Sequence, residues 1–195
     1  MDLNQFTPSS ALVTVIVVSL APFVGVMVTS FTKIIVVLSL LRNALGLQQV
    51  PPNVVLNGMA LVLTIYVMLP VGLDMAERAR SVSNIGSTSG MLAVADAAKE
   101  PLRDFLVRHS SAHERAFFLK TAQKTLSPER ASQISERDFV VVVPAFTVSE
   151  LSAAFQIGFL IFLPFLIIDL VIANILTAMG MMMLSPTTIS LPFKL

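Results

Sequence analysis

Residues 139–178 read FVVVVPAFTVSELSAAFQIGFLIFLPFLIIDLVIANILTA, and this stretch decides the fold class of the chain. Only two of its side chains are charged, Glu150 and Asp169. A run of about eighteen or more apolar residues with so few charges is a candidate to span a membrane. The stretch therefore predicts a membrane protein.

A capping box predicts where the helix in this stretch begins. Thr147-Val148-Ser149-Glu150 places a threonine at the N-cap, so that the Glu150 carboxylate can accept a hydrogen bond from the Thr147 backbone N–H. The helix is then expected to start near Val148 and to run to about Ala178, a length of about 46 Å. Pro164 predicts a kink within it.

Methionines cluster immediately after this helix, around Gly180. The cluster comprises Met179, Met181, Met182 and Met183. Thioether side chains form a soft, adaptable apolar surface, and Gly180 with the following Ser-Pro pair predicts a loop that ends the helix. Two interpretations stay open at this point: a constriction or gasket in a pore, and a buried turn.

Two further apolar blocks, residues 11–41 and 54–73, precede this stretch, and the charges are segregated from all three. Nineteen of the twenty-five charged residues lie between Asp74 and Asp138. We therefore expect an all-α integral membrane protein of long kinked helices and helical hairpins. Its predicted regions are N-terminal apolar helices (1–73), a polar helical extracytoplasmic region (74–138), and the C-terminal apolar helix with its methionine loop (139–195).

The first block is too long for one straight span, because about 31 residues of helix exceed the roughly 30 Å hydrocarbon core. Pro22 and the polar residues at 29–33 predict a kinked helix or a hairpin. Residues 43–53, which include two prolines, predict a loop. Arg42 beside this loop favours a cytoplasmic position for it, which sends the central region to the other side of the membrane.

In the central region, Pro101 predicts the first turn of an amphipathic helix, and Ser127-Pro128 predicts the start of another. His109 and His113 are four residues apart, so on one helix their rings would share a face. Zinc would need at least a third ligand, and we expect a solvated pair without a metal. The near balance of acidic and basic residues argues against a nucleic-acid surface.

Three ionisable residues lie inside apolar blocks: Lys33, Glu150 and Asp169. Such residues are costly in a membrane and usually face a bundle interior or an aqueous path. The capping box accounts for Glu150, and we expect Lys33 and Asp169 to neutralise each other, within one chain or between subunits. The alternative is a proton-relay role for Asp169.

No motif in the chain predicts catalysis or a cofactor, since neither a phosphate loop nor a nucleophile elbow is present. Phenylalanines at positions 155, 159, 162 and 165 predict a helix-packing stripe, with a gate as the less favoured interpretation. Three functions remain open: a pore-forming subunit, an ion-coupled transporter using Asp169 and Lys33, and a passive scaffold.

Several longer motifs narrow this choice. In the first half they are Leu20-Ala21-Pro22-Phe23, Ser30-Phe31-Thr32-Lys33, Leu41-Arg42-Asn43-Ala44-Leu45-Gly46 and Pro51-Pro52-Asn53. In the second half they are Pro144-Ala145-Phe146, Ser149-Glu150-Leu151, Ala154-Phe155-Gln156-Ile157-Gly158-Phe159, the methionine cluster and Ile189-Ser190-Leu191-Pro192-Phe193-Lys194-Leu195. In this order they resemble the FliP/SctR family, the R component of the export apparatus of type III secretion in flagella and injectisomes.

The resemblance implies a structural subunit that is not an enzyme. It implies a ring of five copies which, with the smaller partners SctS/FliQ and SctT/FliR, forms the portal for unfolded secreted proteins. It places a sealing gasket at Met181, Met182 and Met183, with Met179 adjoining. It also implies a location in the bacterial inner membrane, with the assembled complex projecting to the periplasmic side.

Overall fold

The computed structural model describes residues 8–47, 49–81, 88–181 and 183–194. All regular elements in these ranges are helices, which confirms the predicted all-α class. They are α1 (Pro8–Val28), α2 (Phe31–Ala44), α3 (Asn53–Ser81), α4 (Thr88–His109), α5 (Ala112–Thr125), α6 (Pro128–Ala131), α7 (Phe139–Ala178) and α8 (Pro186–Lys194).

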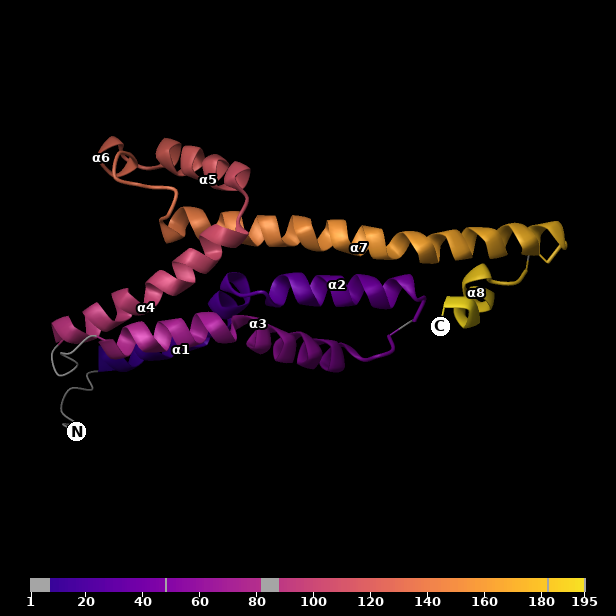
Figure 1. The fold of residues 1–195 in the computed structure, drawn as a ribbon, viewed down its shortest axis with the longest axis horizontal. Coiled ribbons are helices and arrows are strands. Elements are labelled where there is room, and N and C mark those ends of the chain that lie inside the picture. Colours follow the sequence, from indigo (N-terminus) through magenta and orange to yellow (C-terminus); the bar gives the residue numbers. More distant parts are fainter. Residues whose placement is uncertain (1–7, 48, 82–87, 182, 195) are drawn as a thin grey trace.

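Helix α7 is the spine of the molecule, as Figure 1 shows. Helix α2 lies alongside its middle portion, and α3 lies on the other side of α2. Helices α4 and α5 both pack against the N-terminal part of α7, while α8 folds back near its C-terminal end. The polar central region and the methionine loop therefore occupy opposite ends of one long helix (Figure 1).

The predicted start of the last long helix is wrong, because α7 begins at Phe139 and continues unbroken through Thr147. The Ser149 hydroxyl donates to the Ala145 carbonyl at 2.7 Å and accepts from the Ser111 backbone N–H at 2.8 Å. The Ser149 hydroxyl thus serves the beginning of α5, while the presumed capping hydroxyl of Thr147 donates to the Val143 carbonyl at 2.9 Å. A capping-box sequence competes here with an apolar run that is itself long enough to form helix.

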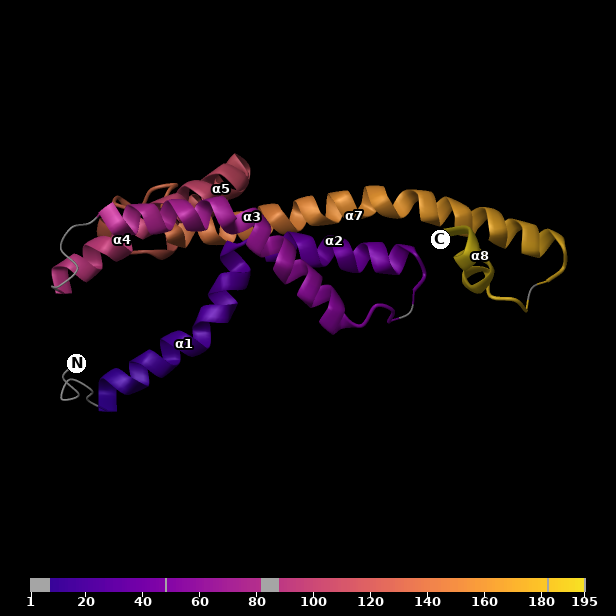
Figure 2. The same ribbon diagram turned by 60° about the horizontal axis from the view of Figure 1, so that its bottom comes forward.

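The first apolar block is bent, as predicted. The segment Val18–Val28 and helix α2 meet at 67°, and Figure 2 shows α1 diverging from the rest of the molecule. Hydroxyls near the bend bond to nearby carbonyls: Thr29 to Gly25 at 2.8 Å and Thr32 to Val26 at 3.1 Å. In an apolar surrounding these bonds satisfy backbone groups that a break in the helix would leave unpaired.

Among the described residues, two helices are long and apolar enough to cross a membrane, α3 and α7. The bent pair of α1 and α2 adds a third crossing if it acts as one span. The loop predicted at 43–53 is confirmed, since α2 ends at Ala44 and α3 begins at Asn53.

The central region is helical, but its boundaries differ from the prediction. Helix α4 starts at Thr88, so Pro101 lies inside it, whereas α6 follows Ser127 as expected. The helix is interrupted at Ser110, between the end of α4 and the start of α5. There the Arg115 guanidinium donates to the Val107 carbonyl at 3.0 Å and to the carbonyl of Ser110.

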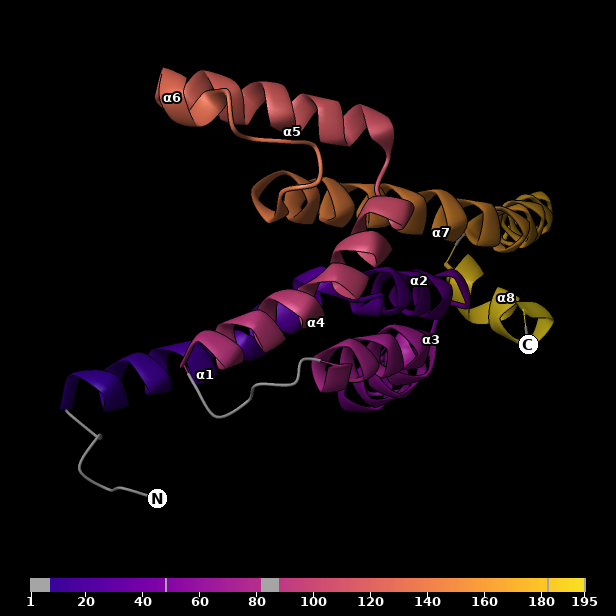
Figure 3. The same cartoon turned by 60° about the vertical axis from the view of Figure 1, so that its left-hand side comes forward.

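This break places the two histidines on different helices: His109 ends α4, and His113 lies in the first turn of α5. Figure 3 shows how α4 and α5 diverge after the break. The predicted shared helical face is therefore wrong.

Close approach of α2 and α7 depends on a single glycine. A Cβ atom at Gly158 would lie 2.1 Å from Cδ1 of Leu40 and 3.1 Å from its Cβ. Small residues at a helix contact allow such packing in membranes. The apolar stripe predicted on α7 is in part uncovered in the single chain, with Phe155 54% and Phe159 63% exposed.

We expect Gly158→Ala to lower the stability of the detergent-extracted protein by about 1–3 kcal/mol, because the added methyl group overpacks the contact with Leu40. The measurement is thermal unfolding followed by circular dichroism. Gly72→Ala is the matched control, since a Cβ there has no neighbour within 4 Å. Equal stabilities of the two variants would contradict the close contact.

Candidate functional site: ion pairs of the apolar helices and the methionine loop

The first ion pair of the apolar helices joins α2 to α7. Lys33 Nζ lies 2.6 Å from Glu150 Oε1, and the Glu150 side chain is only 5% exposed. Two turns farther along, Leu40 of α2 meets Gly158 of α7. Because both contacts advance in the same direction, the two helices run parallel and the ion pair fixes their register.

The second pair joins α7 to α8. Lys194 Nζ lies 2.7 Å from Asp169 Oδ2, and the lysine side chain is 2% exposed. The buried Ser190 hydroxyl donates to Asp169 Oδ1. Lys194 Nζ also donates to the backbone carbonyl of Ala44 at 3.1 Å, which is one of the terminal carbonyls that lack an intrahelical partner at the end of α2.

Within one chain, the predicted pairing of Lys33 with Asp169 is wrong. Glu150 and Asp169 are nineteen positions apart on α7, about 28 Å along a straight helix, so each meets a different lysine. Sequence reasoning missed Lys194 as the partner of Asp169. The sequence did carry a signal for this residue. Lys194 is the one charged residue in the segment that follows the methionine loop, and Ser190 lies four residues before it.

The methionine loop begins with a glycine-dependent helix end. Gly180 has φ +74°. Its N–H bonds to the Thr177 carbonyl at 3.0 Å, and the Met181 N–H bonds to the Leu176 carbonyl at 2.9 Å. These two bonds form a Schellman motif, whose left-handed residue is usually glycine. The motif ends α7 and reverses the direction of the chain.

The described methionines of the loop are exposed. Met179 is 66% exposed, Met181 41% and Met183 100%, while Met182 lies outside the described residues. In this chain alone, the prediction of a buried turn therefore does not hold for these three side chains. Three apolar side chains are therefore uncovered at the end of α7.

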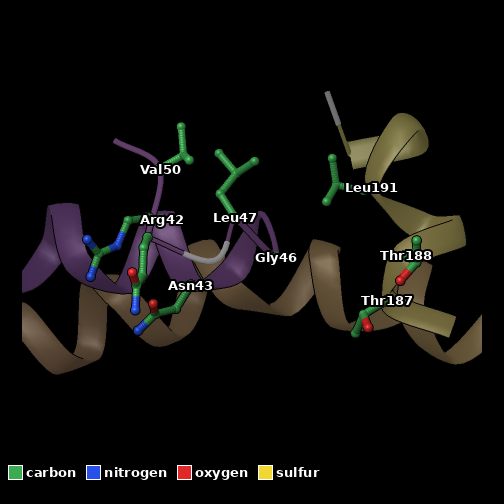
Figure 4. Close-up of a pocket in the computed structure, with 9 residues that line it drawn as sticks. Arg42, Asn43, Gly46, Leu47, Val50, Thr187, Thr188 and Leu191 are labelled. Carbon is green, nitrogen blue, oxygen red and sulfur yellow. The ribbon is translucent and has the colours of Figure 1, made fainter. Parts of the chain in front are cut away.

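A hollow of about 750 Å³ separates the end of α2 from α8, as Figure 4 shows. On the α2 side it is lined by Arg42, Asn43, Gly46, Leu47, Gln49 and Val50, and on the α8 side by Thr187, Thr188 and Leu191. The Arg42 guanidinium bonds to Asn53 Oδ1 at 2.7 Å and to the Pro51 carbonyl at 3.3 Å. This arginine therefore holds the loop between α2 and α3.

Within the part of the chain that the structure describes, no group of three or more His, Cys, Asp or Glu side chains could hold a metal ion. Fold and site together define an all-α integral membrane protein whose buried charges are paired internally and whose apolar helices and methionine tip remain exposed.

Comparison with known proteins gives the family. Residues 13–195 match the model of the FliP family. The hypersensitivity response secretion protein HrcR of Ralstonia nicotianae is 48% identical over 190 residues, covering 96% of this chain and 88% of the relative. The Yop proteins translocation protein R of Yersinia pestis is 49% identical, covering 91% and 82%. The flagellar biosynthetic protein FliP of Bacillus subtilis is 41% identical, covering 92% and 79%.

The chain belongs to the FliP family, the R component of type III secretion, and the resemblance of its motifs to that family is confirmed.

We expect Lys33→Met to destabilise the protein by about 3 kcal/mol, because it leaves the Glu150 carboxylate buried without its counter-charge. The doubly neutral variant Lys33→Met/Glu150→Gln should recover most of this loss, since no unpaired charge remains. Thermal unfolding in detergent measures both. A double variant as unstable as the single one would contradict the pairing.

Proposed function

We propose that this protein is a pore-forming subunit of the export gate of type III secretion. It acts in a ring through which unfolded substrates enter the secretion channel. Membership of the FliP family supports a role in the export apparatus. The single observation that carries the pore function is the exposed methionine tip at the end of α7, supported by an ordered helix end.

The methionine loop is the proposed seal of the pore. Thioether side chains are unbranched and polarizable, so they adapt to many surfaces. A ring of such loops, one from each copy, can close against ions and small solutes yet yield to a passing chain of any sequence. Met181, Met182 and Met183 form this seal, and Met179 supports it.

The uncovered apolar surfaces support assembly with other subunits. On α3, Val54 is 81% and Tyr66 77% exposed, and on α1 Phe23 is 69% exposed. Exposed patches of this kind mark interaction sites or lipid contact. We propose a ring of five copies, joined by SctS/FliQ-like and SctT/FliR-like subunits, in the bacterial inner membrane with the complex projecting to the periplasmic side.

The triple change Met179→Ala/Met181→Ala/Met183→Ala is expected to raise the ion conductance of assembled complexes in planar bilayers by roughly tenfold or more, because alanines cannot fill the constriction. Met59→Ala is the matched control, since Met59 is similarly exposed but lies on α3. Unchanged conductance in complexes that retain all subunits would contradict the seal. Loss of ion-coupled uptake on Asp169→Asn would point to a transporter.

Native mass spectrometry of the extracted protein, alone and with the two smaller subunits, tests the ring directly. We expect a five-copy species that binds those subunits. A monomer or dimer that ignores them would overturn the proposed assembly, whatever the conductance of the methionine variants.

A further inference from the structure

The Lys194 ammonium lies where three helices meet. It is carried by α8, pairs with Asp169 of α7 at 2.7 Å, and donates to the Ala44 carbonyl of α2 at 3.1 Å. The lysine side chain is 2% exposed and Ala44 is 1% exposed. A buried ammonium with partners on two other helices constrains α8 in two directions at once.

This contact closes a hairpin. Asp169 and Lys194 are 25 residues apart in sequence, and between them lie the last turns of α7, the methionine loop and most of α8. The ion pair forms the base of the hairpin, and the loop forms its tip. Ser190, which is fully buried, strengthens the base by donating to the second oxygen of Asp169.

Among the described residues of the tip, few contacts reach beyond the tip itself. Its described backbone bonds are local: Met181 N–H to the Leu176 carbonyl, and Leu184 N–H to the Met181 carbonyl at 3.4 Å. A Cβ atom at Gly180 would have no neighbour within 4 Å. The position of the tip relative to the bundle is therefore set at the base.

We propose that Asp169, Ser190 and Lys194 act as positioning residues, forming a base lock that sets the position of the methionine loop relative to α2. The lock fixes α8 to α7 and α2 at the base of the hairpin. This inference deepens the proposed function and rests on it for its consequence in the pore.

The two charges of the base lock are not interchangeable, because the Ala44 carbonyl needs a hydrogen-bond donor at position 194. A carboxylate at position 194 would face this carbonyl and repel it. The exchanged pair Asp169→Lys/Lys194→Asp is therefore expected not to restore the lock, unlike a symmetric ion pair.

The experiment uses the absence of cysteine from the chain. A single Met181→Cys reporter is labelled with a maleimide in assembled complexes. The rate of labelling is compared between complexes with and without a second change at the base of the hairpin. The second change is the doubly neutral Asp169→Asn/Lys194→Met, which removes the lock without leaving a buried charge unpaired. Lys194→Gln is tested in parallel, and Lys99→Gln is the control because its ion pair is exposed.

We expect the labelling rate to rise about threefold to tenfold in complexes with the doubly neutral base, with unchanged subunit composition, and to stay constant with Lys99→Gln. A purely structural role would lower assembly and leave the rate in assembled complexes unchanged, and that result would overturn the base lock. Rescue by the exchanged pair would also overturn the requirement for a hydrogen-bond donor at position 194.

The two proposals can fail separately. A raised labelling rate, together with unchanged conductance in the methionine variants, would uphold the base lock and overturn the pore seal. The reverse combination would uphold the seal and overturn the lock.

Discussion

A charged side chain in an apolar helix must find a partner before the helix can be buried, because the desolvation of an unpaired charge costs several kcal/mol. Helix α7 carries two such charges, Glu150 and Asp169, and much of the described arrangement follows from how they are paired. Glu150 fixes α2 beside α7, and Asp169 fixes α8 to the far end of the same helix. Between the two pairs, Gly158 allows the helices to approach closely.

The two ion pairs lie in the part of the molecule where helices pack on one another, and the uncovered apolar surfaces lie away from them. Around them, helices contact one another and polar groups are satisfied within the chain. Away from them, α1, α3 and the outer face of α7 present apolar side chains that no described part of the chain covers. A subunit of a membrane assembly needs both parts: a framework that is complete in one copy, and surfaces that lipid or neighbours complete.

Sequence reasoning predicted what depends on composition and local signals. The all-α membrane class, the bend near residue 30, the loop before Asn53 and the glycine-dependent end of α7 all follow from apolar runs, polar interruptions and glycine positions. It failed where a local signal competed with a longer one or with a distant contact. The capping box at Thr147 gave way to an apolar run that continues the helix, and Ser110 broke a pattern that the two histidines made look continuous.

The partner of each paired charge was also beyond local reasoning, because two lysines and two carboxylates allow more than one pairing and only the packing of α2 and α8 chooses between them. The methionine loop is an intermediate case. Its sequence indicated a soft apolar loop, and its exposure at the end of the spine required the structure.

The parallel arrangement of α2 and α7 has a consequence for biosynthesis. The chain must leave α2, cross the whole central region and return before Glu150 can reach Lys33. Those roughly 120 residues take on the order of 6 to 24 seconds to synthesise at about 5–20 residues per second. During this interval the Lys33 ammonium is already attached to an apolar helix without its counter-charge, so the nascent subunit passes through a state in which lipid headgroups, water or an insertion factor must solvate that charge.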